Sequence, residues 1–225
     1  MVPLLAFQLP LALLVLIACY AALQRYLGVD ARFGDVLIGV VVAGASTLIT
    51  SHVTRLLGLG FVPRHSLQNI KLGLSSAIPL VGLDALAIWW LAKPRGARAA
   101  GSGLGLGLAI ANVVLLALTG AAIRPSDFFG VLLILAPTLL AVLIPATLSL
   151  GLALGRDRGR LPVYAVLGVV LLTFNFWLDG TILPGAAFIV YEILAVLVST
   201  GLLALVLRAF GPSGSTPATR VDESL

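Results

Sequence analysis

The sequence predicts an all-α, polytopic integral membrane protein: a bundle of about seven transmembrane helices. Hydrophobic residues make up 60% of the 225-residue chain and charged residues only 10%, whereas about a quarter of a typical soluble domain is charged. Apolar runs of about 20 residues recur along the chain, and each can cross a hydrocarbon layer of about 30 Å as a helix. The runs do not alternate polar and apolar residues as membrane β-strands do. Because lipid cannot satisfy free backbone groups, the spans are expected to be helices.

Seven apolar runs define the expected spans, and polar or basic connections separate them. The first run has no basic stretch before it and no clear cleavage site, which favours a retained span over a signal peptide. A six-span arrangement, with the first run cleaved or the region 179–187 re-entrant, is the alternative. The expected spans are 3–24, 36–57, 72–92, 104–123, 128–154, 163–178 and 186–210.

The basic residues predict how the bundle is oriented. Ten of the 14 Lys and Arg residues fall on one side of a seven-span arrangement and four on the other. Because cytoplasmic loops carry the excess of Lys and Arg, we expect the N-terminus outside and the C-terminus in the cytoplasm, in the cell membrane. Residues 1–210 are expected to form one transmembrane domain, and residues 211–225 a disordered cytoplasmic tail rich in Pro, Ser, Thr and Gly.

The charge pattern also bears on partners. The net charge of +5 comes from short basic loops, so it indicates membrane topology and not a nucleic-acid partner. The expected surroundings are the lipid bilayer, with other membrane subunits or a second copy of the chain as candidate partners.

Glycine and proline residues predict local features of the bundle. Glycines at 101, 103, 105 and 107 open the fourth span, and small residues four apart let two helices approach closely. The basic, Gly/Ala-rich stretch 93–103 before them is expected to be a flexible loop. Pro137 and Pro145 are expected to bend or interrupt the fifth span.

Five polar residues near the predicted outer face form a candidate substrate-binding group. They are His52, Arg55, Asn175, Asp179 and Glu192. A single carboxylate in hydrocarbon costs several kcal/mol, so Glu192 needs a partner, and Arg55 is the favoured cation with His52 next. The alternative is structural: Arg55 and Glu192 only join two helices, and Asp179 belongs to an ordinary exterior turn.

Asp84 is the one acid predicted within the inner half of a span. Ionisable residues within membrane helices often mark proton relays, which makes Asp84 a candidate proton-relay residue. The alternative places it near the membrane interface, where it would interact with the end of the helix that carries Lys93 and Arg95. The residue pattern does not separate these two interpretations.

Motifs for metal binding or catalysis are absent from the sequence. The two histidines, His52 and His65, are 13 residues apart, Cys19 is the only cysteine, and no nucleophile-elbow, zinc-helix or phosphate-loop pattern occurs. We therefore expect no metal, cofactor or catalytic residue, and an enzyme is disfavoured.

Three function classes remain after these exclusions. A small permease or the membrane subunit of a transporter, with a polar cavity near the outer face, fits the polar residues within the spans best. The first alternative is a non-catalytic assembly or anchoring subunit of a membrane complex. The second is an integral-membrane enzyme that acts on a lipid or isoprenoid, with Glu192 and Asp179 as acid and base groups.

Overall fold

The computed structural model confirms an all-helical bundle. It describes residues 2–59, 66–119, 128–181 and 186–210, and these contain helices and no strand. The helices are α1 (Val2–Leu27), α2 (Phe33–Leu56), α3 (Ser66–Arg95), α4 (Ala97–Thr119), α5 (Phe128–Asp157), α6 (Leu161–Thr181) and α7 (Ala186–Phe210). Each covers all or most of one of the seven apolar runs.

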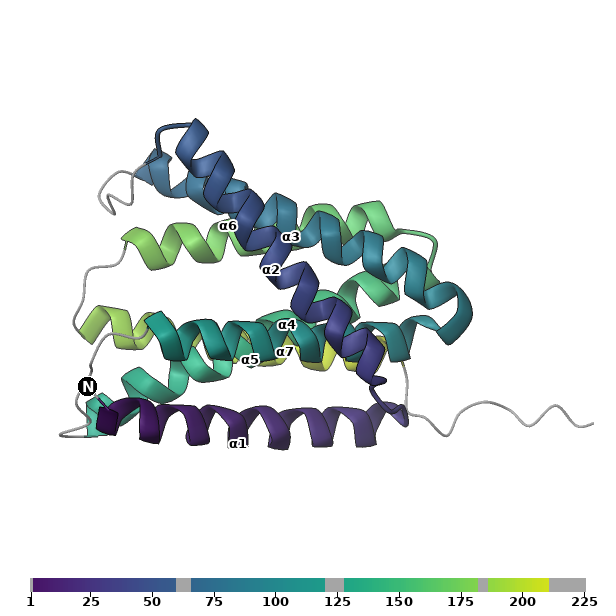
Figure 1. Cartoon of the computed structure of the whole chain (residues 1–225), viewed down its shortest axis with the longest axis horizontal. Coiled ribbons are helices and arrows are strands. Elements are labelled where there is room, and N and C mark those ends of the chain that lie inside the picture. Colours follow the sequence, from purple (N-terminus) through teal and green to yellow (C-terminus); the bar gives the residue numbers. More distant parts are fainter. Residues whose placement is uncertain (1, 60–65, 120–127, 182–185, 211–225) are drawn as a thin grey trace, which may run out of the picture.

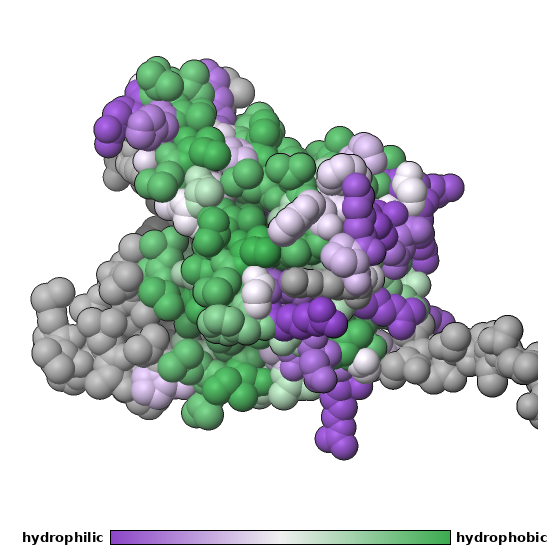
Figure 2. All heavy atoms as spheres, turned by 45° about the vertical axis from the view of Figure 1, so that its right-hand side comes forward, coloured by the Kyte–Doolittle hydropathy of each residue, from purple (hydrophilic) through white to green (hydrophobic). Residues whose placement is uncertain are grey.

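The lengths and apolar compositions of the helices are consistent with a membrane location. Five of them, α2, α3, α4, α5 and α7, are long and apolar enough to cross a bilayer by length and composition. In α1 and α6 the parts with described side chains, Ala12–Leu27 and Leu161–Trp177, form shorter apolar helices. Large hydrophobic side chains are exposed along α6 and α7. Figure 2 shows hydrophobic side chains covering the middle of the molecule and hydrophilic ones gathered toward the ends of the helices. The side of the membrane that each end faces stays a prediction, and the expected tail at 211–225 lies outside the described residues.

Successive helices run in opposite directions (Figure 1). At one end of the bundle the connections are tight, and each contains a glycine with positive φ: Gly28 at 63°, Gly96 at 80° and Gly159 at 66°. Glycine is favoured there because a Cβ atom is strained in the left-handed region. We call this the short-turn end, and it carries Arg25, Arg98, Arg158 and Arg208.

The prediction of a flexible loop at 93–103 is wrong. The connection between α3 and α4 is Gly96 alone, and α4 begins at Ala97. Ala97 and Ala100 to Leu104 are buried. Small residues that suggest flexibility in water instead allow dense packing between helices. The fifth span is likewise not interrupted, because α5 includes both Pro137 and Pro145.

Helix α4 lies inside the bundle and packs against α1, α2, α3 and α5. Two of its glycines, Gly103 and Gly107, face α2. A Cβ atom added at Gly107 would lie 2.1 Å from the carbonyl oxygen of Val36, and one added at Gly39 would lie 2.4 Å from that of Leu104. The backbones of α2 and α4 are therefore in direct contact, and the predicted glycine packing is confirmed.

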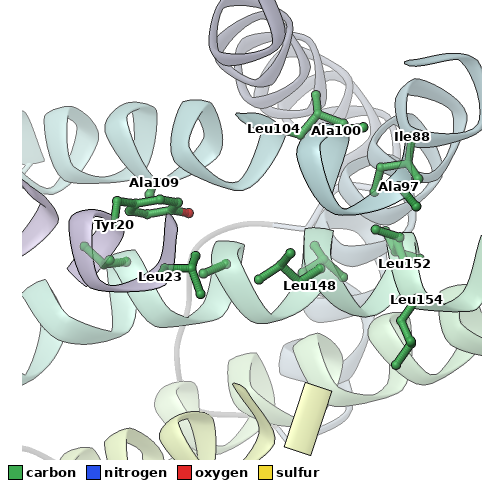
Figure 3. Packing of buried hydrophobic residues seen from close by; sticks show 14 of the residues in the cluster. Tyr20, Leu23, Ile88, Ala97, Ala100, Leu104, Ala109, Leu148, Leu152 and Leu154 are labelled. Carbon is green, nitrogen blue, oxygen red and sulfur yellow. The ribbon is translucent and has the colours of Figure 1, made fainter. Parts of the chain in front are cut away.

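The other two glycines of α4 face α5 and α1. A Cβ atom at Gly101 would lie 2.8 Å from the Cβ of Ala153, and one at Gly105 would lie 3.0 Å from the hydroxyl oxygen of Tyr20. Leu104, Ala109 and their buried neighbours from α3 and α5 fill the core around these contacts (Figure 3). Glycines at alternate positions thus give α4 two narrow faces, one toward α2 and one toward α5 and α1.

Alanine at Gly39 or Gly107 is expected to destabilise the bundle by at least about 2 kcal/mol, because the added methyl group would overlap a backbone carbonyl that cannot move aside. The thermal midpoint of each purified variant in detergent measures the effect. Gly44→Ala is the matched control, since it lies on α2 with no atom within 4 Å of an added Cβ. Equal midpoints for Gly107→Ala and Gly44→Ala would contradict the described contact.

Candidate functional site

Asp84 lies at the centre of the bundle and is completely buried. The Ser149 hydroxyl of α5 donates a hydrogen bond of 2.8 Å to its Oδ2. Its second oxygen, Oδ1, is also buried and has no hydrogen-bond partner among the residues that the structure describes. Among the described residues, the carboxyl group thus accepts one hydrogen bond, from a neutral donor, and this bond joins α3 to α5.

Tyr20 of α1 is the second polar residue at this place. Its side chain is buried, and its hydroxyl lies against Gly105 of α4, a helix that also packs against α3 and α5. Figure 3 shows the Tyr20 ring beside Ala109 of α4. The hydroxyl also lacks a hydrogen-bond partner within the described part of the chain. We call Tyr20, Asp84 and Ser149 the central acid site.

The glycine faces of α4 make room for this site. Gly105 lies against the Tyr20 hydroxyl, and Gly101 lies against the backbone oxygen of Ser149. A larger side chain at either position would occupy the space that these groups fill. The sequence predicts the acid but not Tyr20 and Ser149. The position of a hydroxyl group within an apolar helix does not indicate which residue of another helix it will contact.

Asp84 and Lys93 contact different groups. Lys93 is exposed and its ammonium group lies 3.9 Å from the centre of the Trp89 ring. Asp84 instead faces Ser149 in the interior. The side chain of Arg95 lies outside the described residues.

The five residues predicted at the outer face are not all brought together. His52 and Arg55 are exposed on α2, whereas Glu192 is buried on α7. Helix α2 packs against α3 and α4, and α7 packs against α5. The hydroxyl of Tyr191, next to Glu192, donates to the Oδ1 of Asn175 at 3.0 Å and lies 3.1 Å from its backbone oxygen. The side chain of Asp179 lies outside the described residues.

A further set of buried polar atoms lies where α3 and α6 pack together. A Cβ atom at Gly73 would lie 3.0 Å from the backbone oxygen of Thr173, so the two backbones nearly touch. Asn69 lies four residues before Gly73, and Trp177 lies four residues after Thr173. The side-chain nitrogens of both, Nδ2 and Nε1, are buried and have no hydrogen-bond partner among the described residues. The sequence does not predict this pair, because Asn69 falls in an expected connection, although the four-residue spacings Asn69–Gly73 and Thr173–Trp177 are a usable signal.

Metal binding gains no support from this arrangement, since the described residues contain no group of three His, Cys, Asp or Glu side chains that could hold an ion. Models of known protein families, curated protein sequences and solved structures were compared with this chain, and none matches it. The functional interpretation therefore depends on the residues themselves.

Double-mutant cycles are expected to separate the two outer pairs. For Arg55→Gln with Glu192→Gln, we expect a coupling free energy below about 0.5 kcal/mol, because α2 and α7 have different neighbours. For Tyr191→Phe with Asn175→Ala, we expect about 1 kcal/mol from the lost hydrogen bonding. Both are read from thermal unfolding in detergent, and the reverse order would contradict the described arrangement.

Proposed function

We propose that this multi-pass membrane protein is a transport component, either a small permease or the membrane subunit of a transporter, in which Asp84 exchanges protons. The observation that carries the proposal is the complete burial of Asp84 between membrane-spanning helices with one neutral hydrogen bond. Acids inside membrane helices are rare because their charge is costly there, and they commonly mark proton or ion pathways.

A purely structural role accounts poorly for the acid. An asparagine could accept the hydrogen bond from Ser149 equally well. A buried charge without an ion-pair partner is costly, and a neutral asparagine avoids that cost. An acid at position 84 therefore gives no expected advantage in packing, and its distinctive property is that it can bind and release a proton.

Helix α3 links the central acid site to polar residues nearer the other end of the bundle. Asn69 and Asp84 are both buried on this helix, and 15 residues of α-helix separate them by about 22 Å. Asn175 and Glu192 lie toward this same end on α6 and α7, and we propose that protons reach Asp84 from there.

The proposal is tested by proton flux into liposomes that contain the purified protein. A potassium diffusion potential provides the driving force, and a trapped pH-sensitive dye reports the flux. We expect flux above that of empty liposomes for the wild type and a loss of at least about tenfold for Asp84→Asn, as for removal of a proton-transfer group. Asp157→Asn is the matched control, because Asp157 is an exposed acid at the end of α5. Wild-type flux equal to that of empty liposomes would contradict the proposal and favour the assembly alternative.

The same substitution is expected to leave the fold intact. Asp84→Asn should change the free energy of unfolding by less than about 1 kcal/mol or increase it, because it removes an ionisable group from an apolar core. Thermal unfolding in detergent measures this change. A strongly lowered midpoint would show that the acid serves folding, whatever the flux assay gives.

A further inference from the structure

An apolar groove of about 370 Å³ runs along the outside of the bundle, between α1 and α7. Both helices pack against α5, which forms the floor of the groove while α1 and α7 form its walls. Tyr20 and Tyr26 are the lining residues that carry a side-chain hydroxyl group. The lining residues include Ala22, Leu23 and Tyr26 of α1, Val142 of α5, and Leu203 and Leu207 of α7.

The size of the groove limits its occupant. Its volume of about 370 Å³ lies in the range of small-ligand pockets, about 300–1,000 Å³. The walls belong to apolar helices that we expect at hydrocarbon depth, where the surrounding molecules are lipids.

Arginines mark the short-turn end of this groove. Arg25 lies in the last turn of α1 and Arg208 in the last turn of α7, and both are exposed. Each directly neighbours a lining residue in the sequence, Tyr26 and Leu207 respectively. Lys and Arg near a membrane surface attract anionic lipids.

The end of α7 is fixed in place beside the groove. The guanidinium group of Arg158 donates to the backbone oxygen of Ala209 at 3.3 Å, and that of Arg98 donates to the backbone oxygen of Phe210. These bonds tie the end of α7 to α4 and to the α5–α6 turn. Arg208 therefore belongs to an anchored helix end.

We propose that the groove binds one anionic phospholipid, with an acyl chain between α1 and α7 and the phosphate group beside Arg25 and Arg208. The chain would replace solvent or void against an apolar floor, and the two arginines would select a negative headgroup. The groove and the central acid site share Tyr20, but lipid binding in the groove does not depend on the proposed proton exchange.

Native mass spectrometry of the full chain in detergent tests the proposal. The protein is titrated with phosphatidylglycerol and with phosphatidylcholine that carry identical acyl chains. We expect one phosphatidylglycerol bound in preference to phosphatidylcholine. Arg25→Gln and Arg208→Gln should each reduce that preference about fivefold, from the attraction expected per basic residue. Arg160→Gln, an exposed arginine of the α5–α6 turn, should leave it unchanged.

Two tryptophan variants test the position of the acyl chain. Ala22→Trp should fill the groove and abolish binding of the lipid, whereas Ala21→Trp, on an exposed neighbouring position outside the lining, should retain it. Both positions are exposed on α1, and gel filtration verifies that both variants fold. Equal lipid binding by the two tryptophan variants, or equal affinity of the wild type for the two lipids, would overturn the proposal.

Discussion

Direct backbone contact between α2 and α4, at Gly39 and Gly107, is the constraint on which the rest of the bundle depends. The hydrophobic effect contributes little to helix association in lipid, so close van der Waals packing must hold the helices together. A glycine at each of these positions lets α4 lie against α2, and Gly101 and Gly105 let its other face lie against α5 and α1. With α4 in this place, α1, α2, α3 and α5 surround a common centre.

The same small residues provide the space in which polar groups are enclosed. Tyr20 and Ser149 approach α4 where it has glycines, and Asp84 reaches Ser149 from α3. A membrane protein that needed only stability could fill this space with leucine. Keeping an acid and two hydroxyl groups in the interior adds a desolvation cost, which is the physical basis for assigning the site a function.

The fold was largely predictable from the sequence, whereas the composition of the sites was not. Runs of apolar residues fix helices because lipid leaves the backbone no other option, and glycine spacing identified α4 as a packing helix. The loop prediction for the stretch 93–103 is wrong because glycine, which indicates flexibility in water, allows close helix packing in a membrane. The pairing of Asp84 with Ser149 and of Asn175 with Tyr191 depends on how different helices pack against one another, and no single-helix pattern encodes that packing.

The most direct test of a functional acid at the centre of the bundle is infrared difference spectroscopy across a pH jump. Membranes that contain the wild type are compared with membranes that contain Asp84→Asn. A pH-dependent carboxyl band from a group in apolar surroundings, present in the wild type and missing from the variant, is the expected result. Identical difference spectra would show that Asp84 does not exchange protons and would contradict its assignment as the proton-relay residue.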